Sequence, residues 1–209
     1  MIITYFGKQF WKVQYGDTTI AINPISKDAK GIKTTRFGSD IALVTTQHPS
    51  YNGIEQLSHG EVEPFVIEGP GEYEVGGIFV KGIFSEGIVD GKAFVNTVYT
   101  FMIDGINICF LGNIAGGEMN ASVRGGISEA DVLFVPVSSS EGSLGASEAY
   151  KVAVSLEPSI IIPMDYDEKS IKEFLKEGGV SKVKKVDKLT IKRKDLEGKE
   201  GEIVVFEEQ

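Results

Sequence analysis

Histidine and cysteine are scarce in this sequence, which has two histidines and one cysteine among its 209 residues. A single cysteine excludes a disulfide bond within the chain. Cys109 lies in the apolar run 106–111, where a small buried core residue is the expected role. A nucleophilic cysteine needs a neighbouring base, and the chain has few histidines to supply one. We therefore expect Cys109 to be structural.

Long apolar segments are missing as well. No stretch approaches the roughly 18 apolar residues that a membrane-spanning helix needs, and residues 1–7 have the pattern of a strand and not that of a secretion signal. Acidic residues outnumber basic ones by 30 to 21, which gives a formal charge of −9 and disfavours binding to nucleic acids or anionic membranes. We expect a cytoplasmic protein with no nucleic-acid or membrane partner.

Short strand-like segments dominate the sequence. Alternating or continuous apolar residues predict many strands, and the dipeptides Gly16-Asp17 and Asp104-Gly105 are typical of tight hairpin turns. The expected strands cover residues 2–6, 10–15, 18–22, 40–44, 64–68, 73–75, 78–83, 95–103, 107–111, 131–135 and 159–163. Each half of the chain contains hairpins followed by a strand and a loop. This pattern predicts two packed sheets with helices outside them.

Two amphipathic segments in the second half predict helices. One covers residues 146–156 with Ser147 as its N-cap, and the other covers 167–177 and ends at a Gly-Gly pair. The tail is expected to add two strands on either side of residues 196–199, with its many lysines forming a solvated face. No linker marks a domain boundary, so we expect a single domain over residues 1–209.

A polar loop, residues 45–53, follows the apolar segment 40–44 and contains one of the two histidines, His48. Polar loops at strand ends often carry binding or catalytic residues. A Ser/Gly-rich loop at residues 138–143 is a second candidate contact region, although a plain connection to the next helix is the favoured interpretation. His59, which precedes Gly60, is expected to be an exposed loop residue.

Several segments resemble, in the correct order, proteins of the metallo-β-lactamase fold, and most of these resemble its L-ascorbate-phosphate-lactonase-like branch. The segments are residues 3–7, 20–24, 46–52, 69–74, 96–99, 109–113 and 161–166. Together they span most of residues 1–166. The resemblance implies an α/β (α+β) protein, an αββα sandwich whose site lies at one edge and is built from loops.

The resemblance also implies where metal ligands belong. In that family two divalent metals are held by a His-x-His-x-Asp-His loop, a further histidine, a bridging aspartate and a last histidine. The loop positions here, with those of the aspartate and the last histidine, are Thr46, His48, Ser50, Tyr51, Asn113 and Asp165. The further histidine is missing too, because no histidine follows His59. The site therefore resembles a degenerate metal site with one histidine left.

Ligand chemistry decides what such a site can hold. A hydroxyl or a neutral amide is a poor ligand for zinc, and a tyrosine must first lose a proton whose reference pKa is about 10. His48 and Asp165 supply two ligands, one fewer than a minimal catalytic zinc site needs. We therefore expect no dinuclear zinc centre and no metal cofactor; the alternative is one weakly bound divalent metal at His48 and Asp165.

Three functions stay open, and the favoured one is a non-catalytic member of the fold. It retains a polar pocket, binds a small-molecule ligand there without a metal, and uses Asp165 to hold His48. The residues expected to line this pocket are Thr46, His48, Ser50, Tyr51, Asn52, Glu72, Asn113 and Asp165.

The other two functions are catalytic, on a small phosphorylated or lactone-type substrate. In one, His48 is the base of a metal-independent hydrolase or lyase, and Ser50 or Tyr51 is the nucleophile or acid. In the other, His48 and Asp165, with Glu72 or Glu74, hold one Mg²⁺ or Mn²⁺. A homo-oligomer stays open, because apolar strands can be buried within the domain or by a second copy.

Overall fold

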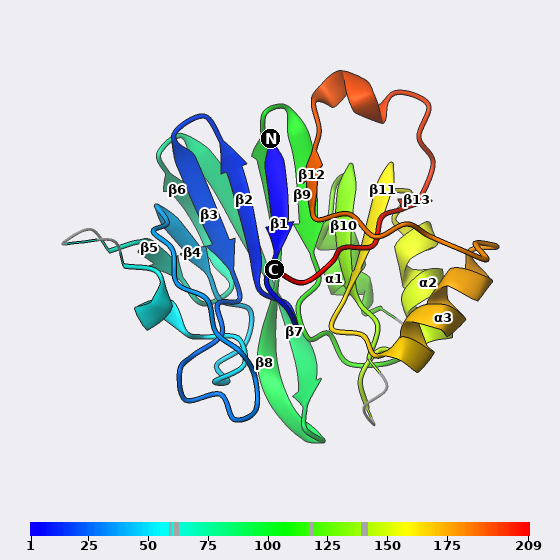
Figure 1. Ribbon diagram of the computed structural model, residues 1–209, viewed down its shortest axis with the longest axis horizontal. Helices are drawn as coiled ribbons and strands as arrows, with labels where there is room; N and C mark the ends of the chain where they lie inside the picture. Colours follow the sequence, from blue (N-terminus) through cyan, green and yellow to red (C-terminus); the bar gives the residue numbers. More distant parts are fainter. Residues whose placement is uncertain (59, 61–62, 118, 139–141) are drawn as a thin grey trace.

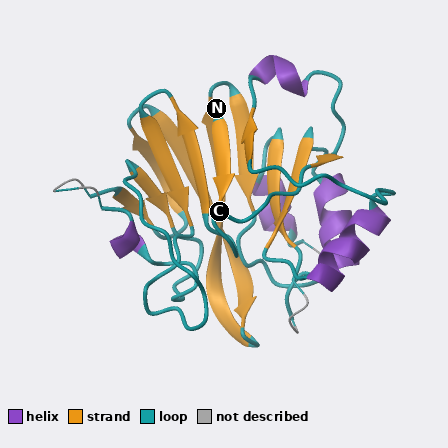
Figure 2. Ribbon diagram, in the orientation of Figure 1, coloured by secondary structure: helices purple, strands orange, loops and turns teal. Residues whose placement is uncertain are grey.

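The computed structural model describes residues 1–209 except 59, 61–62, 118 and 139–141, and its strands form two sheets (Figure 1; Figure 2). The first sheet contains, in spatial order, β12 (Lys188–Thr190), β1 (Ile2–Tyr5), β2 (Trp11–Tyr15), β3 (Thr18–Ile22), β4 (Ile41–Leu43) and β5 (Phe65–Ile67). Its β12–β3 part is antiparallel, whereas β3, β4 and β5 run parallel.

The second sheet is also mixed. In spatial order it contains β13 (Glu202–Ile203), β11 (Ile160–Met164), β10 (Val132–Pro136), β9 (Ile106–Phe110), β8 (Lys92–Ile103), β7 (Ile78–Val89) and β6 (Gly71–Val75). The strands from β6 to β9 pair antiparallel, and those from β9 to β13 pair parallel. The parallel strands β10 and β11 are buried along their whole length, which explains their unbroken apolar sequences.

The two sheets pack face to face around an aromatic core. Trp11 on β2 is fully buried, and its ring meets those of Phe134 on β10 and Phe206 of the tail edge-on, with centroids 4.9 Å apart in each pair. The Tyr5 ring stacks on the indole, with the ring centroids 4.3 Å apart. Such aromatic contacts bury large areas of apolar surface, which is the main force holding the sheets together.

Different elements cover the two outer faces. The helices α1 (Ala121–Gly126), α2 (Ala146–Ser155) and α3 (Glu168–Glu177) form a second core cluster with the outer side chains of the second sheet. The outer face of the first sheet is covered by the connection after β3 and by the 3₁₀-helix η1 (Ile54–Gln56), around Phe10 and Leu57. The α+β sandwich expected from the resemblance is confirmed.

The predicted hairpin turns are confirmed, and one hairpin is longer than expected. Tyr15 pairs with Thr18 across the first turn, and β8 pairs with β9 across the second. The strands β7 and β8 each have twelve residues and meet at Asp90 and Gly91, so the prediction that β7 ends at residue 83 was wrong. Figure 1 shows this hairpin extending beyond the rest of the sheet. Ser85, Glu86 and Gly87 interrupt the apolar alternation in the second half of β7, so the sequence does not show that the strand continues.

The two predicted helices are confirmed, with corrections at their starts. Helix α2 has Gly145 as its N-cap and not Ser147, whereas Asp167 caps α3 by accepting hydrogen bonds from two backbone N–H groups. The short helix α1, whose N-cap is Asn120, was not predicted from the sequence. Among the described residues, no helix is long and apolar enough to cross a membrane.

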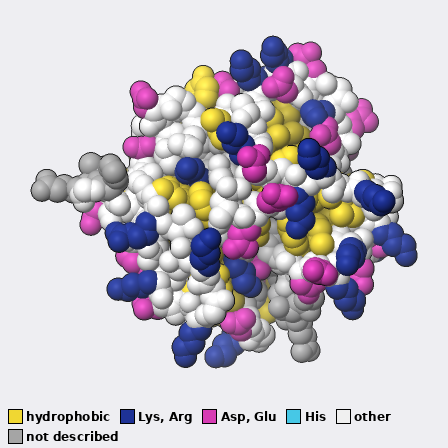
Figure 3. All heavy atoms as spheres, in the orientation of Figure 1, with side chains coloured by type: hydrophobic (Ala, Val, Ile, Leu, Met, Phe, Trp, Pro, Cys, Tyr) yellow, Lys and Arg dark blue, Asp and Glu magenta, His cyan; other side chains and the backbone are white. Residues whose placement is uncertain are grey.

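The tail contributes the two predicted strands, but to different sheets. Strand β12 pairs with β1 and β13 pairs with β11, with the 3₁₀-helix η2 (Arg193–Leu196) between them. The lysines of the tail are exposed, apart from the half-buried Lys199. On the face drawn in Figure 3, basic and acidic side chains are interspersed, as on an ordinary solvated surface.

A buried tyrosine crosses between the sheets and generates a stability prediction. Tyr99 on β8 donates to Val44 O and lies within hydrogen-bonding distance of Ile67 O, 3.0 and 3.1 Å away, both in the first sheet. Tyr99→Phe should lower the free energy of unfolding by about 1–2 kcal/mol, because the buried Val44 carbonyl loses this donor, whereas Ile67 O still accepts from the Val44 backbone N–H. Urea denaturation measures the loss. Tyr15→Phe, at an exposed tyrosine, is the control, and equal losses in the two variants would contradict the assignment.

Candidate functional site

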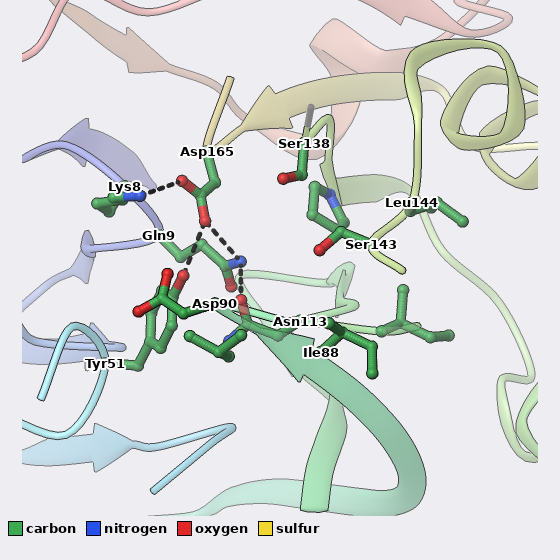
Figure 4. A pocket seen from close by; sticks show the side chains of 13 residues that line it. Lys8, Gln9, Tyr51, Ile88, Asp90, Asn113, Ser138, Ser143, Leu144 and Asp165 are labelled. Atoms are coloured by element: carbon green, nitrogen blue, oxygen red, sulfur yellow. Dashed lines mark hydrogen bonds and ion pairs between the residues drawn. The ribbon is translucent and has the colours of Figure 1, made fainter. Parts of the chain in front are cut away.

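A small polar pocket lies at the edge of the sandwich, where loops from both sheets meet the tip of the β7–β8 hairpin (Figure 4). Its position fits the expectation of a site built from loops at one edge. The residues that line it are Lys8, Gln9, Tyr51, Ile88, Val89, Asp90, Asn113, Ile114, Pro136, Ser138, Ser143, Leu144 and Asp165.

Asp165, directly after β11, is the centre of the polar side of this pocket (Figure 4). Its Oδ1 atom lies 3.1 Å from Lys8 Nζ. Its Oδ2 atom accepts a hydrogen bond of 2.9 Å from the Tyr51 hydroxyl and a longer one of 3.4 Å from Gln9 Nε2. The carboxylate is mostly buried and is therefore compensated by one cation and two neutral donors.

Four residues at or behind the pocket have left-handed backbone conformations that non-glycine residues seldom adopt. These are Lys8, Asn23, Asp90 and Asp165, with φ of 53°, 50°, 49° and 52°. Each costs of order 1 kcal/mol or more and persists only where the surroundings fix it. The backbone N–H of Asp165 donates to Lys8 O at 2.9 Å, so two of the strained residues hold each other. These backbone conformations place the Lys8 and Asp165 side chains within ion-pair distance of each other.

Tyr51 is a hydrogen-bond donor at this site. Burial, and next the negative charge of Asp165, raise the pKa of the Tyr51 hydroxyl far above its ordinary value. The phenol therefore keeps its proton at physiological pH and donates it to Asp165. A phenol in this state cannot act as a base, and it does not supply the phenolate that a metal ligand would need.

His48 lies outside the pocket lining, against the hairpin tip. Its Nδ1 atom accepts a hydrogen bond of 3.2 Å from the backbone N–H of Ser50, which leaves the proton on Nε2. Nε2 lies 3.8 Å from Asp90 Oδ2, and the Phe94 ring meets the imidazole edge-on. The prediction that Asp165 holds His48 was wrong: the partner of His48 is Asp90, because the long β7–β8 hairpin brings that residue within reach.

Asn113 and Thr46, at the positions where the resemblance implies the bridging aspartate and the first histidine of the loop, are hydrogen-bonded to each other. Asn113, after β9, donates from Nδ2 to Thr46 Oγ1 at 3.2 Å and accepts at Oδ1 from Gln9 Nε2 at 2.8 Å. Thr46 and Gln9 are fully buried, and Thr46 lies behind the pocket surface. The amide of Asn113 thus has both ends engaged by protein groups.

The remaining candidates lie apart from the pocket lining. Ser50 is buried beside His48, and the half-buried Asn52 donates to Gln47 Oε1 at 3.1 Å. Glu72 and Glu74 are exposed on β6, where Glu72 lies opposite Lys81, so Glu72 does not line the pocket that we expected it to line. An edge strand at the far end of the second sheet cannot bring its side chains to this loop cluster.

Two further expectations concern residues outside the polar loop. Ser138 and Ser143 of the Ser/Gly-rich loop line the pocket, whereas residues 139–141, like His59, lie outside the described residues. Burial raises the pKa of the Cys109 thiol to about 12. The thiol is fully buried on β9 and stays protonated, as a structural core residue does.

Sequence reasoning missed Lys8, Gln9 and Asp90, which all line the pocket. Gln9 offered a signal, because it is a polar residue between Phe6 and the apolar strand β2 and must find partners when buried. Asp90 forms a typical turn dipeptide with Gly91, which marks the hairpin tip. Lys8 offered none, since its role depends on the loop conformation.

The residues present do not fit a dinuclear metal centre. Four of the six ligand positions named above carry Thr, Ser, Tyr and Asn side chains, and the described residues contain no group of three or more His, Cys, Asp or Glu side chains that could hold a metal ion. The two remaining donors, His48 and Asp165, are engaged by different partners. The chemistry of the donor set therefore departs from what zinc requires.

Comparison with known families identifies the fold. A family model described as a beta-lactamase superfamily domain matches residues 2–165, which is most of the chain. The chain belongs to the β-lactamase superfamily. No curated protein sequence matches it.

Two solved structures are similar to this chain over nearly their whole length. A Thermotoga maritima protein, proposed to be a zinc-dependent hydrolase of the metallo-β-lactamase superfamily, is 28% identical with a TM-score of 0.77; 100% of this chain and 99% of that one are covered. A proposed metal-dependent hydrolase from Parabacteroides distasonis is 16% identical, with a TM-score of 0.66 and coverage of 99% and 93%. The second likeness shows the fold alone.

The Tyr51–Asp165 hydrogen bond generates a prediction. Tyr51→Phe should lower the free energy of unfolding by about 1.5–3 kcal/mol, because a buried carboxylate loses a donor. Chemical denaturation at neutral pH measures this loss. The matched control is Tyr73→Phe, whose hydroxyl donates to the neutral carbonyl of Gly69. The assignment is contradicted if removing the Tyr73 hydroxyl costs as much as removing that of Tyr51.

Proposed function

We propose that this chain is a non-catalytic member of the β-lactamase superfamily that binds a small polar molecule in the Asp165 pocket without a metal ion. The observation that carries the proposal is the direction of the side chains at the ligand positions. Asn113 is bonded to Thr46 and Gln9, and Asp165 is bonded to Lys8 and Tyr51. These groups are directed at one another and not at a common point where a metal would sit.

The geometry around His48 supports the proposal over metal-independent hydrolysis. A serine nucleophile needs a base that accepts its hydroxyl proton. Here the nitrogen of His48 that faces Ser50 already accepts the Ser50 backbone N–H, and the other nitrogen faces Asp90. Tyr51, the other candidate, holds its proton firmly because of its raised pKa. No activated nucleophile results from these contacts.

Size and charge limit the ligand. Water can reach about 40 Å³ of the pocket, which is room for roughly three water molecules. Lys8 contributes one positive charge, whereas Asp90 and Asp165 contribute two negative ones. This balance disfavours a phosphate or carboxylate ligand. We therefore expect the pocket to take one end of a neutral molecule with both donors and acceptors, such as a small amide or polyol.

Metal analysis tests the non-catalytic part. Protein purified without chelator should contain no stoichiometric metal, and millimolar Zn²⁺ or Mn²⁺ should not raise its melting temperature, because no set of converging ligands favours the folded state. Phosphodiester, lactone and thioester substrates should show no turnover that is lost in His48→Ala or Asp165→Ala. Stoichiometric metal that disappears in His48→Ala would sink the proposal, as would turnover that depends on either residue.

Ligand titration tests the binding part. Acetamide and glycerol should give saturable shifts of the backbone amide signals of Asn113 and Asp165 in ¹H–¹⁵N NMR spectra, and phosphate should not. The response should weaken in Lys8→Met, which removes one wall of the pocket, and persist in Lys169→Met, at an exposed lysine of α3. Saturable binding of phosphate alone, or no saturable binding of any probe, would contradict the ligand class.

A further inference from the structure

A chain of hydrogen bonds runs through the protein behind the pocket, and every link points the same way. Side-chain donors and acceptors follow each other at 3.1, 2.8, 3.2, 3.2 and 2.8 Å. The order, from donor to acceptor, is Asn23, Gln9, Asn113, Thr46, Asn96 and Ser85, and the Ser85 hydroxyl then donates to the backbone carbonyl of Asn96. Hydrogen bonds aligned in this way polarise and strengthen one another.

All six side chains are buried, and their remaining polar atoms are also engaged. Asn23 Nδ2 donates a second bond to Thr45 Oγ1, and its Oδ1 accepts from the backbone N–H of Thr45. Asn96 accepts from the backbone N–H of Asn113 and donates to Leu111 O. Buried amides without partners are costly, so a network this complete must be specified side chain by side chain.

The chain joins the two sheets. Gln9, Asn23 and Thr46 lie on loops that leave strands β1, β3 and β4 of the first sheet. Asn113 follows β9, and Ser85 and Asn96 lie on the paired strands β7 and β8, all in the second sheet. The bonds Gln9–Asn113, Asn113–Thr46 and Thr46–Asn96 therefore each cross from one sheet to the other.

The backbone makes room for this chain of hydrogen bonds. Gly112 has a φ of +64°, and a Cβ there would collide with Asn96 Oδ1 and with the Thr45 side chain. Only glycine combines this left-handed conformation with such a close approach. The segment before Asn113 is thus shaped to place its amide between Gln9 and Thr46.

The chemistry of the chain conflicts with a metal at the same place. Asn113 directs its NH₂ group, which cannot ligate a cation, at Thr46, and its oxygen receives the Gln9 NH₂ group. Rotating the amide to offer its oxygen elsewhere would break two buried bonds. Asn113 and Thr46 stand where the resemblance implies two metal ligands, and the polar atoms of both side chains are engaged within the hydrogen-bond chain.

We propose that this amide chain replaces the metal centre as the joint between the two sheets at the site edge. The assignment goes beyond the proposed function, because it concerns what holds the edge together and not what the pocket binds. In this role Asn113 is the central link, with Gln9 and Thr46 on either side. Gln9 is shared with the pocket, since the same Nε2 lies within hydrogen-bonding distance of Asp165.

A pair of isosteric substitutions tests the proposal. Asn113→Asp removes the donor to Thr46 and buries a charge, whereas Asn52→Asp removes a similar amide bond at a half-buried position on the same edge. Asn113→Asp should lower the melting temperature by about 5 °C and Asn52→Asp by about 2 °C or less. Zn²⁺ or Mn²⁺ should not restore the loss, although the aspartate restores a family ligand.

Amide hydrogen exchange distinguishes a chain that couples the two sheets from side chains that are only buried. Ser85→Ala removes only the hydrogen bonds at the Ser85 end of the chain, in the second sheet. This variant also tests the proposal if Asn113→Asp does not fold. Exchange should quicken at residues 45–51, which follow the first sheet, as well as around Ser85. The proposal is overturned if the quickening stays within the second sheet, if Asn113→Asp costs no more than Asn52→Asp, or if metal raises the melting temperature of either protein.

Discussion

The edge of this sandwich depends on a set of neutral amides and hydroxyls that bond to one another across the two sheets. A metal centre joins loops through one charged point that several ligands share. The amide chain joins the same kind of loops through successive short contacts, each of which needs its own partner. Asn23 and Ser85, at its two ends, are both buried, so the chain tolerates little change at either end. It also carries no net charge, which avoids the cost of burying carboxylates without a cation.

The pocket is a consequence of the same arrangement. Gln9 belongs to the chain through Asn113 and to the pocket through Asp165, so the joint helps to orient the one strongly buried carboxylate of the site. The left-handed conformations of Lys8 and Asp165 add to this by placing their side chains in an ion pair. Tyr51 completes the set as a hydrogen-bond donor to Asp165.

The sequence predicted the sandwich, both long helices and the hairpin turns, because these depend on local patterns. It also placed Tyr51, Asn113 and Asp165 near one another, through the order of the segments that resemble the family. The partner of His48 could not be predicted, since it depends on how far β7 and β8 continue to pair. The role of Gln9 could not be predicted either, because the packing of the two sheets determines that Gln9 contacts Asn113.

The most direct measurement is a crystal structure of the protein soaked in Zn²⁺ or Mn²⁺, with anomalous data collected at the absorption edge of the metal. We expect no anomalous peak between Asn113, His48 and Asp165, and the Asn113 amide should still donate to Thr46. A peak at that place, with the Asn113 oxygen and the Asp165 carboxylate turned towards it, would show that this edge still forms a metal site.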